Sequence, residues 1–308
     1  MTKRGKAPWG PVAGIVAVIL AIVVLGVLLL SGKSIDILQP AGVIASQQKD
    51  LLIFTVVLTM FAVVPVFILL FMAAWKFREG NPKKTKYSPD DEGNRTLELI
   101  WWGIPLTIIT ILGIVTWVTT HQLDPFRELD NGKEPVRVQV ISLDWKWLFI
   151  YPDQGIASVN ELYIPVNRPI NFTLTADSPM SAMWIPKLGS QIYVMKGMST
   201  KLSLMSSETG VFKGSNTNIT GKGYSDMYFK VHSVNESSWQ DWIKKAEKAE
   251  PLNYKRYQEL AKPSRNVGIK LFALEDKELF DKVVMKYASS SGMDHNTDSN
   301  YEARKGSH

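Results

Sequence analysis

Two long apolar segments stand out in the first 120 residues. Residues 51–75 carry no charged side chain, and residues 97–118 carry only Glu98, close to their start. Each run is long enough to cross a bilayer as a helix. Both runs are apolar on every helical face, which favours membrane helices over a buried helical pair in a soluble protein. We therefore predict a two-helix transmembrane hairpin within residues 34–122.

An earlier apolar run, residues 12–30, follows three basic residues among the first six. A basic flank before an apolar core is typical of a signal peptide or of a first membrane helix. The run is long for a signal peptide, and no small-residue cleavage motif follows it. The pattern favours an uncleaved membrane anchor over residues 1–33 and leaves cleavage open.

The segment that joins the two hairpin helices is strongly basic. Its basic residues are Lys76, Arg78, Lys83, Lys84, Lys86 and Arg95. Basic residues near membrane ends mark the cytoplasmic side. We therefore expect this loop in the cytoplasm, and everything after about residue 121 in the periplasm or the external space.

Short β-type segments fill the middle of the chain. Residues 136–140 alternate strictly between apolar and polar positions, and an apolar and aromatic run continues to Tyr151. The further strand candidates are residues 162–166, 170–176, 182–186, 192–195, 200–205 and 227–232. Gly, Pro, Asn and Ser separate these candidates. Regular short strands of this kind predict an all-β Greek-key sandwich or barrel over residues 134–236.

Helical patterns return after the β region. Residues 237–262 and 271–287 each predict a helix, and together they suggest a helical, aromatic-rich arm over residues 237–288. The aromatic residues of the first helix are Trp239, Trp242, Tyr254 and Tyr257. They could pack on the β domain, on a neighbouring subunit, or on both. Residues 289–308 are small, polar and charged, and predict a disordered tail.

Charge and cysteine content narrow the function classes. The chain of 308 residues has a formal net charge of +6, yet no basic stripe with interleaved aromatic residues points to nucleic acid. Much of the excess positive charge lies beside the apolar segments, so membrane lipid is the expected partner. The chain contains no cysteine, which excludes a disulfide framework and leaves the redox compartment undetermined.

The stretch GSNTNITGKGYSDM at residues 214–227 resembles a copper-binding loop that has lost its ligands. In subunit II of haem-copper oxidases this loop has the pattern C-x3-C-x3-H-x2-M. The four matching positions here are Asn216, Thr220, Tyr224 and Met227. The residue whose backbone carbonyl joins the copper shell matches Asn218, and the histidine of an upstream strand matches Ser181. Taken alone, the stretch is also typical of an ordinary polar loop between strands.

Copper electron-transfer sites need thiolate and imidazole ligands. The chain has four scattered histidines and no cysteine, so Met227 is the only matching side chain that could bind copper. We therefore expect no metal site in this chain.

Further motifs carry the resemblance over about residues 40–285. They are WKFR (75–78), KYSP (86–89), ELIWWGIP (98–105), DWKWLFIYP (144–152), QGIA (154–157) and PKLGSQIY (186–193). The chain resembles subunit II of bacterial haem-copper quinol oxidases of the cytochrome bo type, the branch without the dinuclear copper. This resemblance implies a cupredoxin-like domain behind two membrane helices. It also implies partner subunits I, III and IV, with haems, copper and quinol all held by subunit I.

The resemblance assigns roles to three further residues. Glu98 matches a glutamate at the mouth of a proton path known as the K-channel; the alternative is an acidic residue that the helix dipole stabilises at a helix N-terminus. Trp145 and Trp147 match the aromatic patch through which electrons enter copper-bearing relatives. Without copper, we expect these tryptophans to pack against helix ends and subunit I.

Three classes of function follow. The favoured class is a non-catalytic subunit of a proton-pumping quinol oxidase in a bacterial cytoplasmic membrane. The alternatives are a subunit II of cytochrome c oxidase, which the absence of cysteine disfavours, and a membrane-anchored scaffold or assembly factor. The sequence leaves open whether the donor is ubiquinol or menaquinol and which haem the partner carries.

Overall fold

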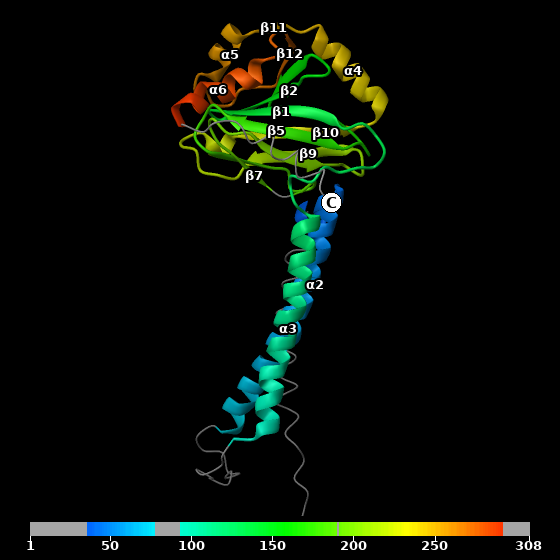
Figure 1. Ribbon diagram of the computed structural model, residues 1–308, viewed down its shortest axis with the longest axis vertical. Helices are drawn as coiled ribbons and strands as arrows, with labels where there is room; N and C mark the ends of the chain where they lie inside the picture. Colours follow the sequence, from blue (N-terminus) through cyan, green and yellow to red (C-terminus); the bar gives the residue numbers. More distant parts are fainter. Residues whose placement is uncertain (1–35, 78–92, 190, 292–308) are drawn as a thin grey trace, which may run out of the picture. The chain divides into compact units, whose positions relative to one another are not determined.

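The computed structural model describes residues 36–77, 93–189 and 191–291 (Figure 1). The predicted anchor over residues 1–33 lies outside the described residues, as does the tail from residue 292. Among the described residues there are two compact units, which we treat separately. One is the apolar hairpin, and the other is a β domain with its helical arm.

The hairpin consists of α2 (Val43–Lys76) and α3 (Arg95–Gln122). Both helices exceed the predicted segments, because helix-compatible polar residues extend their ends, and α2 continues through Pro65. Each is long and apolar enough to cross a membrane. Large side chains such as Phe61 and Leu99 are at least 70% exposed in this chain, which is unfavourable in water and favourable in lipid.

The β domain is a two-sheet sandwich. The larger sheet has the strand order β11 (Pro251–Leu252), β12 (Lys270–Leu274), β3 (Ile156–Val159), β2 (Lys146–Tyr151), β1 (Val136–Leu143), β5 (Ile170–Ala176) and β8 (Thr200–Leu204). The smaller sheet has the order β4 (Glu161–Pro165), β10 (Tyr228–Val234), β9 (Gly210–Asn216), β6 (Ser181–Trp184) and β7 (Ile192–Val194). Pairs β1–β5, β4–β10 and β11–β12 are parallel, and all other neighbours are antiparallel. The predicted all-β sandwich is confirmed.

The strand prediction was wrong in two respects. The apolar run that begins at residue 136 is two antiparallel strands, β1 and β2, joined by a tight turn in which Trp145 has φ +61°. A left-handed conformation at a tryptophan has no sequence signal, because glycine normally takes such positions. Strands β3 and β9 were missed. Strand β9 contains Gly214, against which the Phe229 ring packs so closely that a Cβ atom would lie 2.1 Å from it.

The arm also differs from the prediction. The expected helix over residues 237–262 is two helices, α4 (Glu236–Glu247) and α5 (Tyr254–Ala261), with β11 between them. The expected helix over residues 271–287 begins with β12, which pairs with β3, and only then continues as α6 (Leu279–Ser291). Long-range strand pairing overrides local helical preference at β12. Helix α6 also includes residues 289–291, which had been assigned to the disordered tail.

Two apolar cores explain why β1 and β2 are almost continuously apolar. One face of these strands packs into the sandwich through side chains such as Val140 and Phe149. The opposite face packs against the arm through Ile141, Leu148 and Ile150. Figure 1 shows α5 and α6 on the face of the larger sheet that is turned away from the smaller sheet. Strands buried on both faces lose the apolar and polar alternation of a half-exposed sheet.

A short segment that ends in the first turns of α2 belongs to the β domain. Residues 39–48 cluster with the sandwich, although they fall within the range 34–122 in which the hairpin was predicted. The Ala41 amide donates to the Lys187 carbonyl at 2.8 Å, and the Ala45 amide donates to the Leu188 carbonyl at 3.1 Å. Both alanines are buried. At Gly42 an added Cβ would lie 2.8 Å from backbone atoms of Leu188, so only glycine fits.

Candidate functional site

The loop that resembles a copper site connects β9 to β10 and includes a short 3-10 helix, Tyr224–Asp226. The backbone N–H of Asn216 closes the base of the loop by donating to the Met227 carbonyl at 3.1 Å. Strand β6 pairs with β9 through Met183 and Asn216, so the strand that carries Ser181 lies beside the loop. The fold therefore brings together the two segments that supply copper ligands in the family it resembles.

Asn216, the last residue of β9, forms hydrogen bonds with both the oxygen and the nitrogen of its side-chain amide. Its Oδ1 accepts from the backbone amides of Ala182 at 2.9 Å and Asn218 at 3.1 Å. Its Nδ2 donates to the Asn218 carbonyl at 2.9 Å and to Thr220 Oγ1 at 3.1 Å. Because all four hydrogen bonds join Asn216 to neighbouring residues of the site, its amide can hold the loop closed without a metal.

The remaining positions make separate contacts. Ser181 is buried, accepts from Ser142 Oγ at 2.9 Å and donates to the Pro179 carbonyl at 3.1 Å. Met227 is buried, whereas the Tyr224 side chain is 38% exposed. Hydrogen bonds thus connect Asn216 with Asn218 and Thr220. Ser181 is hydrogen-bonded to Ser142 instead, and Tyr224 lies at the surface.

These side chains do not fit a copper centre. They supply hydroxyl and amide groups plus one thioether, whereas copper electron-transfer sites use thiolate and imidazole. Asn216 and Thr220 already satisfy one another. Within the described parts of the chain, no three histidine, aspartate or glutamate residues form a group that could hold a metal ion.

The two tryptophans of the predicted aromatic patch have different environments. Trp145 covers the loop: its Nε1 donates to the Thr220 carbonyl at 3.0 Å, and its ring allows no side chain at Gly223. Trp147 is fully buried and packs edge-on against Phe229 at 5.8 Å between ring centroids. The expectation that both tryptophans pack against helix ends and subunit I was therefore wrong for Trp147, because a fully buried ring has no free surface.

Glu98 lies in the first turn of α3 and belongs to the hairpin rather than to the loop site. The Asn94 side chain accepts from the Thr96 amide at 3.0 Å and caps the start of the helix. An acidic residue in this first turn interacts favourably with the helix dipole. This position is compatible with both roles considered for Glu98.

Lys146, which is fully buried in β2, was not among the predicted site residues. Its Nζ donates to the Lys262 carbonyl at 2.9 Å and to Ser264 Oγ at 2.7 Å. Burial lowers the pKa of this lysine, since the charged form loses solvation. The acceptors belong to the loop after α5, so Lys146 ties the sandwich to the arm. In the sequence, the only indication of this role was that Lys146 lies between Trp145 and Trp147.

Asp177, at the end of β5, is a second missed link. Its carboxylate accepts from Tyr257 at 2.7 Å, Lys286 at 2.8 Å and Tyr287 at 2.5 Å, all three from the arm. Burial alone would raise the pKa of Asp177, but these hydrogen bonds outweigh it and lower the pKa below its ordinary value. Sequence offered no signal for this cluster, because its members are about 80 to 110 positions apart.

The aromatic residues of the arm pack on the sandwich, which confirms the first of the expected arrangements. The Trp242 ring stacks on Tyr163 at 4.6 Å between centroids. Trp239 lies 5.5 Å from Tyr151. Trp239, Trp242 and Tyr257 are buried, whereas Tyr254 is 37% exposed. The arm is therefore an integral part of the β domain.

Comparisons with known proteins agree with this architecture. The family model described as "Cytochrome C oxidase subunit II, periplasmic domain" matches residues 152–234, and "COX Aromatic Rich Motif" matches residues 245–291. "Cytochrome bo(3) ubiquinol oxidase subunit 2" of Pseudomonas aeruginosa is 45% identical over 84% of this chain and 78% of that protein. "Ubiquinol oxidase subunit 2" of Acetobacter aceti is 40% identical over 88% of both chains. "Quinol oxidase subunit 2" of Bacillus subtilis is 37% identical over 88% of this chain and 81% of that protein.

The fold and these matches define a membrane-anchored protein with a periplasmic, cupredoxin-like domain and a C-terminal helical arm. Such a domain can serve many functions, because fold alone does not fix function. The relatives match most of the chain at well above 30% identity. The chain belongs to the quinol oxidase subunit 2 family.

Restoring the missing ligands is expected to create a copper site. The variant carries Ser181→His, Asn216→Cys, Asn218→Glu, Thr220→Cys and Tyr224→His in the full chain, with Met227 retained. Two thiolates with imidazole and thioether favour copper, so thiolate-to-copper absorption should appear on titration. The parent chain should show none.

A matched control for this variant keeps Asn216 and Thr220 and makes the other three substitutions. Without thiolates it should show no thiolate-to-copper absorption at any copper concentration. A folded five-residue variant that also lacks this absorption would count against the alignment of this loop with the copper-binding pattern.

Proposed function

We propose that this chain is subunit II of a terminal quinol oxidase that oxidises quinol, reduces oxygen to water and pumps protons. In this role the chain carries no redox centre and is non-catalytic. Haems, copper and the quinol site belong to subunit I, and subunits III and IV complete the complex. The chain is a multi-pass protein of the bacterial cytoplasmic membrane.

One observation carries this proposal. The loop keeps the spacing of a copper site, but at the first ligand position the Asn216 side chain forms four hydrogen bonds within the protein. A subunit that receives electrons from cytochrome c through copper requires thiolate ligands here, and an amide cannot replace them. A subunit of an oxidase whose electrons arrive from quinol at another subunit has no such requirement. This distinction favours the quinol branch over the cytochrome c branch.

Topology supports the same role. Residues 39–48, 123–189 and 191–291 belong to one compact unit, so the start of α2 and the end of α3 open to the same side of the membrane. The family model describes this domain as periplasmic. The basic loop between the helices then lies in the cytoplasm, as the distribution of lysine and arginine favours.

This orientation predicts the behaviour of fused reporters. A reporter joined after Asp90 should be active only as a cytoplasmic protein, and one joined after Asn131 only as an exported protein. Alkaline phosphatase and green fluorescent protein fusions measure the two states. Exported activity at Asp90 would contradict the orientation.

Purification of the complex tests the function itself. An affinity tag on this chain should recover haem-containing subunits together with quinol-dependent oxygen consumption. Haem spectra, subunit identification and an oxygen electrode provide the measurements. Recovery of the chain without a haem protein would instead favour a scaffold or assembly factor.

Glu98 tests the proposed proton-entry role. We propose that its carboxylate raises proton availability at a channel entrance, which a methyl group cannot do. Glu98→Ala should slow quinol oxidation roughly tenfold, less than the loss expected for a group that transfers a proton in the chemical step. Glu98→Asp should be milder. Unchanged turnover in an assembled Glu98→Ala enzyme would leave Glu98 with only its helix-terminal role.

A further inference from the structure

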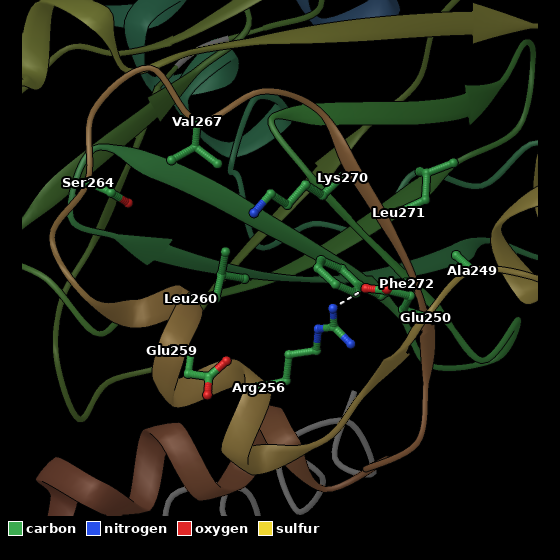
Figure 2. A pocket seen from close by; sticks show the side chains of 10 residues that line it. All are labelled: Ala249, Glu250, Arg256, Glu259, Leu260, Ser264, Val267, Lys270, Leu271 and Phe272. Atoms are coloured by element: carbon green, nitrogen blue, oxygen red, sulfur yellow. Dashed lines mark hydrogen bonds and ion pairs between the residues drawn. The ribbon is translucent and has the colours of Figure 1, made fainter.

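The arm contains a cleft of about 620 Å³ that the proposed function does not use (Figure 2). Its walls come from the segment before β11, from α5, from the loop over residues 262–269 and from β12. Every lining residue falls within residues 245–291, which match the aromatic-rich motif. The volume is in the range of small-molecule sites.

The loop wall of this cleft is fixed by buried contacts with the sandwich. Lys146 donates to Ser264 Oγ at 2.7 Å. Asn160 Nδ2 donates to the Val267 carbonyl at 2.8 Å. Because these hydrogen bonds exist without a ligand, binding does not have to order the wall, and a preorganised wall lowers the cost of binding.

The cleft has an apolar floor and contains one ion pair, whose two charges neutralise each other. Phe272 is buried beneath it, and Leu260 and Val267 are half-buried at its side. The Arg256 guanidinium lies 5.7 Å from the centroid of the Phe272 ring and forms an ion pair with Glu250. Figure 2 shows this pair at one end of the cleft.

Two opposite charges in the cleft remain uncompensated. Lys270 on β12 and Glu259 on α5 both line it and are exposed. In the described part of the chain, neither takes part in an ion pair. Behind Ser264 lies the buried ammonium of Lys146, which hydrogen-bonds only neutral acceptors. Lys270 therefore supplies the positive charge of the cleft, and Glu259 supplies the opposite charge.

We propose that this cleft binds a small zwitterion, namely an α-amino acid with an apolar side chain. The carboxylate pairs with Lys270, the ammonium group pairs with Glu259, and the side chain packs on Phe272 and Leu260. A ligand with only one charge would leave one of the two protein charges unpaired. This site is independent of electron transfer and of the proposed role of Glu98.

Titration of L-leucine into the purified full chain in detergent, followed by calorimetry, tests the proposal. We expect saturable binding that leucinamide, which lacks the carboxylate, and 4-methylpentanoate, which lacks the ammonium group, reproduce only weakly. Loss of one charge-assisted contact weakens binding about tenfold or more. Lys270→Gln and Glu259→Gln should each show this loss. The matched controls Lys244→Gln and Glu128→Gln, both exposed outside the cleft, should bind like the parent.

Three outcomes would overturn the proposal. The first is absence of saturable leucine binding at millimolar concentration by folded protein. The second is binding that neither cleft variant changes, or that 4-methylpentanoate matches. The third is protection of Lys270 from an amine-labelling reagent in the purified complex, since the cleft would then be covered by another subunit.

Discussion

Asp177→Asn is expected to loosen the C-terminal arm from the sandwich. The buried carboxylate holds Tyr257, Lys286 and Tyr287 at once, and an amide offers only one acceptor and adds two donors. Only the carboxylate side of the ion pair with Lys286 is buried, and leaving buried hydrogen-bond donors without their acceptor costs about 2 kcal/mol. Thermal unfolding of the purified chain should therefore occur at lower temperature, and hydrogen exchange in α6 should become faster.

The pH dependence of this effect has a defined sign. The folded state lowers the pKa of Asp177, so the carboxylate contributes stability above its unfolded pKa of about 3.9. That contribution is lost as the pH falls through the lower, folded pKa. The stability difference between the parent and Asp177→Asn should thus be largest at neutral pH and shrink below about pH 4.

The control substitution is Asp281→Asn, an exposed carboxylate on α6. It changes the same charge on the arm without touching the cluster, and should cost only the roughly 0.3–1 kcal/mol of its favourable interaction with the N-terminus of α6. Equal destabilisation by both variants would show that net charge, rather than the buried cluster, controls attachment of the arm.

Gly42→Ala is expected to destabilise the β domain by about 3 kcal/mol, the upper part of the usual range for overpacking. The added Cβ would lie 2.8 Å from the Leu188 Cα and carbonyl oxygen and 2.9 Å from the Met205 oxygen. These are backbone atoms, so they cannot move without breaking the hydrogen bonds that hold residues 39–48. Thermal unfolding and resistance to limited proteolysis measure the loss.

Gly113→Ala provides the matched control. Gly113 lies within α3, and an added Cβ there meets no atom within 4 Å. Alanine is also a better helix former than glycine, so this variant should be at least as stable as the parent. If Gly42→Ala is equally stable, the close approach to Leu188 is not what requires glycine.

Local patterns predicted the features that depend on local physics. Unbroken apolar runs gave the two membrane helices, and spacing alone aligned the loop that contains Asn216. The interactions inside the loop were predictable only in part. The missing thiolates exclude copper, but the hydrogen bond from the Ala182 amide to Asn216 comes from a strand 34 residues away.

The errors have one physical cause. Strand β12 lies in a helical pattern and becomes a strand because β3 offers it a pairing edge. Trp147 belongs to an aromatic cluster in sequence and is buried because Phe229 covers it. Lys146 and Asp177 gain their partners from the arm, more than 75 positions later. Such contacts join distant segments, and no local window of sequence contains both partners.

The contribution of residues 39–48 to the β domain has a consequence for biosynthesis. This segment, which includes the start of α2, is synthesised before the rest of the hairpin, whereas its partners Lys187, Leu188 and Met205 follow both helices. The ribosome must therefore complete the helical hairpin, and the export machinery must deliver the later strands, before Ala41 can find its partners. A secreted fragment that begins after α3 would lack this segment entirely. Complete folding of the domain therefore depends on correct insertion of the hairpin.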